Sequence, residues 1–302
     1  MNIMITGGLG YIGSWLAKRL LNEGHHVTIV DNAVTHDLKR YDKARTPLER
    51  AGAVVVIDDA RNLNSSILKG TDIVFHLAAI SGIKACEHDA HGSRLVNTKL
   101  TAQMLNACQD ARVKTMVFTS TAAVYADAQK CMETGETIPQ NRYAKTKLLA
   151  ERELEGAKNV KVVIARLSNV FGHGYYDKKT VVSNFVRGAL KDETLEIYGN
   201  GEQVRDFVHI NDVVDGLIFL TNATAGIYNL GSGRTLKVRE LASKVIKKTQ
   251  SKSALMNKRT DCVEPQPGYK YVIDKIKKEG WKPKVSIDKG IVQLAEGILN
   301  DK

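Results

Sequence analysis

Residues 2–31 read NIMITGGLGYIGSWLAKRLLNEGHHVTIVD, and this stretch decides the fold. It begins with a short apolar run, Asn2–Ile5, which predicts a buried strand. A helical pattern with one apolar face starts at Ser14. A second predicted strand, His26–Val30, leads directly to Asp31. Three glycines at three-residue spacing connect the first strand to the helix: Gly7, Gly10 and Gly13.

Each part of this strand–turn–helix–strand unit has a physical role in holding a dinucleotide. One glycine allows the sharp turn, another lets the backbone approach a pyrophosphate, and the third lets the helix pack closely on the strand. Free N–H groups at the helix N-terminus attract the phosphates. Asp31, 18 residues after Gly13, can accept hydrogen bonds from the adenosine ribose and would repel a 2′-phosphate. The stretch therefore predicts that the chain binds NAD.

The rest of the chain falls into two differently patterned parts. Up to residue 170, apolar strands alternate with helices, most clearly Val96–Ala111 and Arg142–Glu155, which predicts an α/β fold with a doubly wound parallel sheet of the Rossmann type. After Gly172, short strands mix with helices. We therefore predict an NAD-binding Rossmann domain over residues 1–170 and a smaller, interleaved α/β substrate-binding domain over residues 171–302.

Composition is that of an ordinary globular protein. The chain has 302 residues, 43% hydrophobic and 25% charged, without a membrane-length apolar run or a signal-peptide pattern, so we expect it in the cytoplasm and off the membrane. The net charge of +11 comes from dispersed lysines and arginines, which does not favour nucleic-acid binding. Its cysteines form no paired motif, so we expect no metal site: Cys86, Cys108, Cys131 and Cys262.

One of three Tyr-x-x-x-Lys matches stands in a position that suits catalysis. Tyr143 and Lys147 begin a run of good helix formers, and the i,i+4 spacing puts both side chains on one face. The other two matches, at Tyr175 and Tyr271, lie in a glycine loop and in a strand-like run. A nearby ammonium and a positive nicotinamide ring would lower the tyrosine pKa so that it can act as a base. Thr121, at the end of a buried strand, is the hydroxyl that we expect to hold the substrate oxygen.

These motifs resemble the extended short-chain dehydrogenase/reductases, in particular the nucleotide-sugar epimerases and dehydratases, and most of all the UDP-glucose 4-epimerases. The resemblance covers nearly the whole chain. It is carried by the following segments: residues 6–13 (TGGLGYIG), 30–32 (VDN), 59–61 (DAR), 76–79 (HLAA), 120–125 (STAAVY), 143–147 (YAKTK), 166–172 (RLSNVFG), 197–212 (IYGNGEQVRDFVHIND) and 280–283 (GWKP).

The resemblance implies a set of site residues. The catalytic residues are Thr121, Tyr143 and Lys147. The cofactor-binding residues are Gly7, Gly10, Tyr11, Ile12, Gly13, Asp31, Asn32, Asp59, Ala60, Leu77, Ala78, Ala79, Asn97, Tyr143, Lys147 and Leu167. The substrate-binding residues are Asn169, Val181, Val182, Tyr198, Arg205 and Tyr271. Among these, Asn169 and Arg205 would hold the diphosphate, and Tyr198 would stack on the base.

Two departures from the family pattern concern the sugar-nucleotide pocket. Gln266 stands where the family usually has an arginine, and the loop from Pro267 to Asp274 is about two residues short, so Lys270 is an alternative contact to the diphosphate. The segment between the catalytic threonine and tyrosine is trimmed as well. Where the family pattern places the residue that gates the sugar C2 substituent, this chain has Tyr271, which favours a UDP-hexose over an N-acetylhexosamine.

The residues beside Thr121 discriminate between reactions. A 4,6-dehydratase is expected to carry an acid/base pair there, and a UDP-glucuronate decarboxylase a glutamate, but this chain has Ala122 and Ala123, which cannot move protons. NAD-dependent 4-epimerisation of a UDP-hexose through a 4-keto intermediate is therefore the leading hypothesis. A dehydratase or decarboxylase and a non-catalytic NAD- or RNA-binding relative are the alternatives. The resemblance also implies a homodimer, paired through the helices Val96–Ala111 and Arg142–Glu155.

Overall fold

A seven-stranded parallel sheet forms the centre of the molecule. The computed structural model describes residues 1–33, 38–125, 130–175, 179–259 and 270–300. The strand order is β3-β2-β1-β4-β5-β7-β11, and every neighbouring pair is parallel. The strands are β1 (Asn2–Thr6), β2 (His26–Asp31), β3 (Val54–Ile57), β4 (Ile73–His76), β5 (Thr115–Thr121), β7 (Lys161–Leu167) and β11 (Gly226–Leu230).

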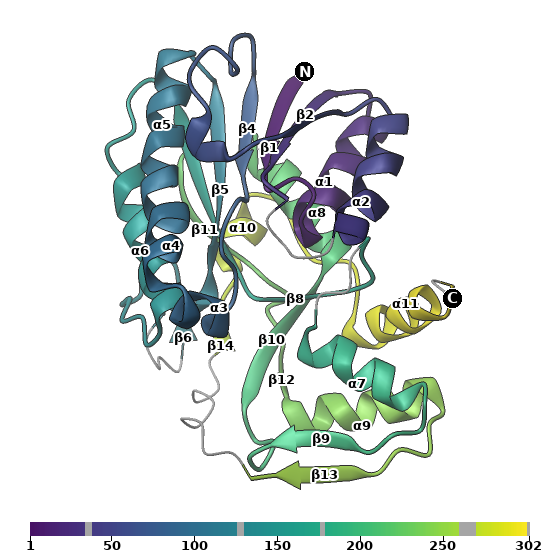
Figure 1. Ribbon diagram of the computed structural model, residues 1–302. Coiled ribbons are helices and arrows are strands. Elements are labelled where there is room, and N and C mark those ends of the chain that lie inside the picture. The colour runs from purple at the N-terminus through teal and green to yellow at the C-terminus, as the bar shows by residue number, and fades with distance from the viewer. Residues whose placement is uncertain (34–37, 126–129, 176–178, 260–269, 301–302) are drawn as a thin grey trace.

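Helices cover both faces of this sheet, as Figure 1 shows. One face buries apolar side chains with α1 (Tyr11–Asn22), α2 (Leu38–Arg50) and α8 (Ile210–Leu220). The other face packs against α5 (Leu100–Asp110) and α6 (Arg142–Leu154). Coverage on both faces explains the nearly continuous apolar strands, since a parallel sheet buried on both sides has no polar face. The predicted doubly wound α/β fold is confirmed.

A smaller part lies below the carboxyl ends of the strands in Figure 1 and has a core of its own. Its helices are α7 (Val181–Ala189), α9 (Val238–Thr249) and α11 (Ile287–Asn300). Its strands are β8 (Asn169–Phe171), β10 (Val204–His209) and β12 (Thr235–Lys237) in one sheet, with β9 (Leu195–Tyr198) and β13 (Leu255–Lys258) in another. The division at residue 170 remains a prediction, and β11 and α8 return from the second half to the large sheet.

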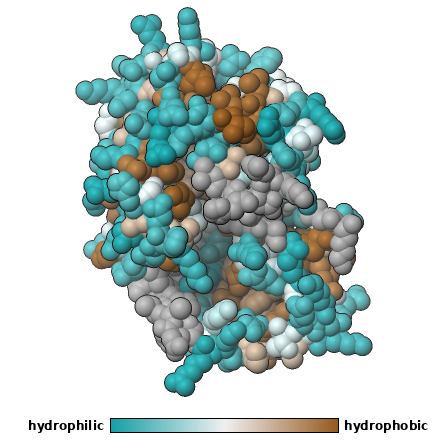
Figure 2. All heavy atoms as spheres, in the orientation of Figure 1, coloured by the Kyte–Doolittle hydropathy of each residue, from teal (hydrophilic) through white to brown (hydrophobic). Residues whose placement is uncertain are grey.

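Short elements complete the described chain. They are η1 (Ala60–Asn62), α3 (Ile83–His88), α4 (Ala90–Arg94), η3 (Ala122–Val124), α10 (Asp274–Lys278), and the paired strands β6 (Lys130–Cys131) and β14 (Lys270–Tyr271). Hydrophilic side chains cover most of the face seen in Figure 2, with smaller apolar patches among them. Among the described residues, no helix is both long enough and apolar enough to cross a bilayer.

The helix expected over Val96–Ala111 differs from the prediction. It starts earlier, at α4, and passes through a π-helical stretch, Leu95–Lys99, before continuing as α5. Such π-helical turns are rare and often mark functional sites, because they redirect side chains within a helix. Asn97, a predicted cofactor residue, lies in this turn.

Candidate active site

The glycine turn after β1 leaves no room for side chains. Gly7 has a φ of 69°, and a Cβ there would lie 2.7 Å from the backbone N of Ala78. A Cβ on Gly13 would lie 2.3 Å from the carbonyl oxygen of Gly7. These contacts explain why the chain needs glycine at both positions, and they bring the turn against the segment after β4 that contains Leu77, Ala78 and Ala79.

The N-terminus of α1 suits a phosphate group. Its N-cap is Gly10, no side chain caps it, and the first turn carries no acidic residue. The first N–H groups of a helix lack partners within the helix and carry partial positive charge. The side chain of Tyr11 points elsewhere, because its hydroxyl donates to the carbonyl of Gly172 at 2.8 Å. This uncapped helix start behind a glycine turn is an arrangement that fits the pyrophosphate of NAD.

Asp31 ends β2 beside the glycine turn. Its carboxylate accepts hydrogen bonds from the backbone N–H of Leu9 at 3.0 Å and of Ala33 at 3.1 Å, which fixes its orientation. Burial raises the pKa of Asp31, and the two backbone hydrogen bonds oppose that shift. A fixed carboxylate at this strand end can still accept from ribose hydroxyls, as the sequence predicts.

Other predicted cofactor residues lie around this turn with different exposures. Asp59 accepts from Arg61 in an ion pair of 2.6 Å and caps η1. Its neighbour Ala60 is buried, whereas Asn32 is exposed. The remaining side chains, Ile12 and Leu167, are half-buried and buried respectively.

The predicted catalytic residues come together where β5 meets α6. Tyr143 and Lys147 lie one turn apart on α6, and the Thr121 hydroxyl is close enough to the Tyr143 phenol to lower its pKa. Lys147 is 1% exposed, with its Nζ 4.0 Å from the centroid of the Phe118 ring. The three groups predicted from the sequence therefore lie together at the carboxyl end of a central strand, where ligands of such sheets bind.

Burial works against the lowering of the tyrosine pKa that catalysis needs. It raises the pKa of Tyr143 to about 12, the nearby Cys86 adds to the rise, and the nearby Thr121 hydroxyl opposes it. Burial also lowers the pKa of Lys147 to about 7. The physical reason is that desolvation disfavours both charged forms, tyrosinate and ammonium. To activate Tyr143, Lys147 must therefore stay protonated although burial disfavours its ammonium form.

Asn97 has a different position from the one expected for a direct cofactor contact. It is fully buried, and its side chain amide exchanges hydrogen bonds with the backbone of Ile80 at 2.8 and 3.1 Å. It also donates to Thr146 Oγ1 at 3.0 Å. The residue therefore ties the segment after β4 to α6, next to Lys147.

A buried histidine that was not predicted as a site residue extends this network. His76 exchanges hydrogen bonds with Thr6 Oγ1 at 2.7 Å and Thr101 Oγ1 at 3.1 Å. Because the Thr101 hydroxyl donates to the carbonyl of Asn97, it accepts from Nε2–H of His76. His76 Nδ1 therefore accepts from Thr6. The available signal in the sequence was that His76 is a polar residue at the end of an otherwise apolar strand, β4.

The predicted substrate residues lie in the smaller part. Asn169 on β8 donates to the carbonyl of Asp206 at 3.0 Å, and Arg205 is on the neighbouring β10. Two acidic residues near Arg205 in the sequence have partners of their own. Glu202 pairs with Lys237 at 2.7 Å, and Asp206 accepts from Ser232 at 2.8 Å.

Three predicted pocket residues have dissimilar surroundings. Tyr198 is 56% exposed, as a platform for a base would be. Val181 is half-buried, but Val182 is fully buried in the small core and cannot frame a pocket. The reason is the helical period, which turns consecutive residues of α7 about 100° apart.

Tyr271 has the environment of a core residue. It is 1% exposed, and its hydroxyl donates to the carbonyl of Arg166 at 2.6 Å. Its ring packs edge-on against Tyr125. The steric gate expected from Tyr271 therefore finds no support here. Gln266, Pro267 and Cys262 lie outside the described residues.

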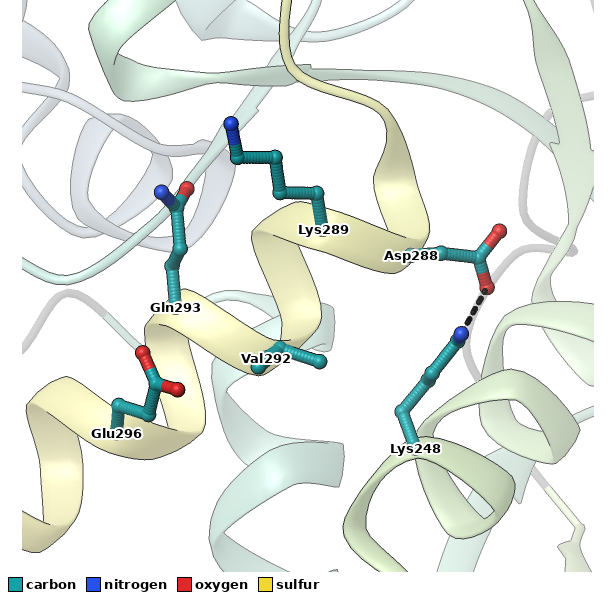
Figure 3. A pocket seen from close by; sticks show the side chains of 6 residues that line it. All are labelled: Lys248, Asp288, Lys289, Val292, Gln293 and Glu296. Carbon is teal, nitrogen blue, oxygen red and sulfur yellow. Dashed lines mark ion pairs between the residues drawn. The ribbon is translucent and has the colours of Figure 1, made fainter.

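A separate surface pocket of about 500 Å³ lies between α9 and α11 (Figure 3). Lys248 of α9 points toward Asp288 across 4.0 Å, while other side chains project from α11. Its lining residues are Lys248, Asp288, Lys289, Val292, Gln293 and Glu296. These do not overlap with the predicted site residues, so we do not assign the reaction to this pocket.

A dinucleotide-binding turn beside a threonine, a tyrosine and a lysine defines an NAD-dependent enzyme. The model of the NAD dependent epimerase/dehydratase family matches residues 3–231, and the chain belongs to this family. The chain is 30% identical over 324 residues to UDP-N-acetyl-alpha-D-glucosaminuronate decarboxylase of Bacillus cytotoxicus, covering 99% of this chain and 98% of the relative.

Solved structures of UDP-sugar epimerases have the same fold. UDP-glucuronic acid 4-epimerase of Bacillus cereus, solved with UDP-glucuronic acid and NAD, has a TM-score of 0.90 and 25% identity over 100% of both chains. UDP-glucose 4-epimerase of Thermotoga maritima, solved with UDP-glucose, has a TM-score of 0.89 and 25% identity, covering 100% of this chain and 99% of that one. The cofactor of this enzyme is NAD.

Proposed function

We propose that the enzyme is a UDP-hexose 4-epimerase. The observation that carries the proposal is the local sequence Thr121-Ala122-Ala123 opposite Tyr143. One hydroxyl and one phenol meet there, and methyl groups stand where other reactions of this family need an acid or a base. A 4-epimerase requires a single base, because the same group removes and returns the proton of one hydroxyl.

The residues of the chain divide the work as follows. Tyr143 takes the proton of the sugar C4 hydroxyl, and Thr121 holds the same oxygen through a hydrogen bond. Lys147 supplies the positive charge that stabilises tyrosinate. NAD, which the glycine turn and Asp31 would hold, would supply the acceptor for the hydride from C4 and the donor that gives the hydride back. Rotation of the 4-keto sugar between the two transfers exposes its opposite face, so the product carries the inverted C4 centre.

The smaller part would hold the nucleotide. We propose that Arg205 binds the diphosphate with its guanidinium, that Asn169 assists, and that Tyr198 stacks on the base. A guanidinium suits phosphate oxygens because its N–H groups match them in pairs. The full cofactor and substrate sets given above belong to this proposal, except for the direct cofactor contact of Asn97 and the pocket roles of Val182 and Tyr271.

A decarboxylase is the second candidate, because a relative that the chain matches over nearly its whole length is a UDP-sugar uronate decarboxylase. The two reactions share oxidation at C4 and differ in the fate of a carboxylate at C5. We favour epimerisation because Ala122 and Ala123 offer no group to move a proton during loss of CO₂.

A substrate panel tests the choice. The purified enzyme is incubated with UDP-glucose, UDP-glucuronate and UDP-N-acetylglucosamine, and with dTDP-, GDP- and CDP-hexoses, and the products are followed by NMR. The proposal expects 4-epimers from UDP-hexoses. A UDP-pentose with release of CO₂, or a 4-keto-6-deoxy sugar, would refute it.

We also propose a homodimer through α5 and α6. The apolar residues expected at this interface are mostly core: Leu100, Met104 and Leu148 are 2%, 1% and 8% exposed, and Leu149 alone is 39% exposed. Around it the exposed positions are polar, including Lys145 and Arg152. We therefore expect a weak dimer, since stable homodimer interfaces are markedly apolar.

A further inference from the structure

Helix α6 carries a buried carboxylate in line with the catalytic pair. Glu151 follows Lys147 by four residues, as Lys147 follows Tyr143, so the three side chains form one stripe along the helix. Glu151 is 3% exposed. A carboxylate is rarely buried to this extent unless it is paired.

The partners of Glu151 come from two central strands. It accepts from Ser120 Oγ on β5, and from Arg166 on β7 through Nη2 at 2.6 Å and Nε at 3.1 Å. Ser120 and Arg166 are register partners in the sheet, and the next pair is Thr121 and Leu167. Glu151 therefore fastens α6 to both strands directly beside the catalytic threonine.

The Glu151 carboxylate affects the protonation of Lys147. Burial disfavours the ammonium, and Glu151 is the largest influence that favours it. The other titratable groups facing Lys147 are Tyr143 on the same helix, Cys86 on α3 and His76 on β4. His76 is neutral in this environment, because burial lowers its pKa to about 3.

Arg166 is the cationic partner of this carboxylate. Its guanidinium forms the buried ion pair with Glu151 and lies 4.8 Å from the centroid of the Tyr125 ring. An unpaired carboxylate at this depth would be costly, and the guanidinium offsets that cost. The pair thus fixes a negative charge one helical turn from Lys147.

We propose that Glu151 is a positioning residue of the reaction: held by Ser120 and Arg166, it keeps Lys147 in its ammonium form and fixes α6 so that Tyr143 stays within reach of Thr121. The inference rests on the proposed function, because the ammonium matters only if Tyr143 acts as the base. The Lys147 side chain can nevertheless be observed without turnover.

The test measures the protonation of Lys147 by NMR in protein with ¹³C-labelled lysine, with K147R identifying the resonance. We expect E151Q to lower the Lys147 pKa by about one unit, a tenfold change in the protonated-to-neutral ratio. E153Q, which alters an exposed carboxylate on the same helix, should leave it unchanged.

Because E151Q leaves Arg166 buried without its anion, a double variant, E151Q/R166M, keeps the inference testable if the single variant does not fold. In the double variant the Lys147 pKa should still fall, because the carboxylate that favours its ammonium form is gone. A Lys147 pKa within about 0.3 of wild type in the folded variants would overturn the proposal.

A kinetic experiment separates this inference from the proposed function. In the pH profile of kcat, the fall at alkaline pH should move to lower pH in E151Q or the double variant, because kcat falls as Lys147 loses its proton. In E153Q it should stay in place. An unmoved fall in E151Q and the double variant would contradict the role of Glu151. If no nucleotide sugar is converted by wild type, the proposed function fails, and the NMR titration still decides whether Glu151 maintains the charge.

Discussion

Tyr143 and Lys147 form a pair whose members are each costly to ionise. In the protein alone, burial raises the pKa of the phenol to about 12 and lowers that of the amine to about 7. Bringing a positive nicotinamide next to this pair favours tyrosinate, since opposite charges stabilise each other strongly where water is excluded. The site is therefore arranged to become basic when the cofactor is present.

Removing the phenolic oxygen should abolish turnover without emptying the cofactor site. We expect Tyr143→Phe to lower kcat by about 10²–10⁴-fold, the range for general base catalysis. Bound NAD, measured after denaturing the protein, should stay at the wild-type level because the ring remains. Tyr175→Phe, in another Tyr-x-x-x-Lys match, is the control and should stay active. A Tyr143→Phe enzyme within about tenfold of wild type, or about 1.4 kcal/mol, contradicts the assignment.

Asp31 should determine the choice of dinucleotide. Its carboxylate is fixed by the N–H groups of Leu9 and Ala33, so it cannot turn away from a 2′-phosphate. Calorimetry on cofactor-free protein should show NAD binding with little binding of NADP. In Asp31→Asn the preference should narrow, because the amide lacks the repelling charge. Equal affinities in the wild type would disprove the argument.

At the level of elements, a hydrogen-bonded line connects β1, β4 and the π-helical turn. Thr6 donates to His76, His76 donates to Thr101, and Thr101 donates to Asn97. The neutral imidazole suits this arrangement, because its Nδ1 accepts and its Nε2–H donates. Burial and the nearby Lys147 lower the pKa of His76 to about 3.

This chain of hydrogen bonds through His76 predicts that the free energy of unfolding decreases in acid. The unfolded chain protonates His76 near pH 6.5 and the folded protein does not, so its contribution is complete above pH 6.5 and falls as the pH drops toward 3. Between pH 6.5 and 5 we expect a loss of about 2 kcal/mol in the free energy of unfolding. The free energy of unfolding, measured in urea, should lack this part of its pH dependence in His76→Gln and retain it in the exposed-site control His91→Gln. The same pH dependence in the wild type and both variants would show that His76 does not contribute.

The sequence predicted the elements well where pattern and chemistry act locally. Short apolar runs and runs of good helix formers located β1, β2 and α6 to within a few residues, and the i,i+4 spacing paired Tyr143 with Lys147. It could not predict the π-helical turn, which depends on Asn97 bonding to Ile80 and Thr146 in other segments. For the same reason the Glu151–Arg166 pair was not recognised, because its partners meet only in the folded sheet.

At the scale of the whole molecule, the proposed site lies between two cores. The glycine turn and the proposed catalytic residues lie at the carboxyl edge of the large sheet, and the smaller part lies below this edge in Figure 1. Its strands β9 and β10 carry Tyr198 and Arg205, the proposed nucleotide contacts. Tyr271, by contrast, belongs to the interior that joins β14 to β7 through the carbonyl of Arg166. A position inferred from spacing along the chain does not reveal such packing.

The homodimer is testable by sedimentation. We expect a mass that rises with protein concentration, and a lower tendency to associate in Leu149→Glu, which places charge at the apolar position of the proposed face. Leu299→Glu, at an exposed position on α11, is the matched control. A monomer mass at all concentrations would rule out the dimer.

The most direct test of 4-epimerisation follows the hydrogen on C4. UDP-glucose carrying deuterium at C4 is incubated with the enzyme in ordinary water, and the product is analysed by NMR and mass spectrometry. The account predicts UDP-galactose that retains deuterium at C4, because the hydrogen leaves and returns within one closed site. Loss of the label to solvent, transfer of the label to C6, or absence of an inverted product would contradict the account.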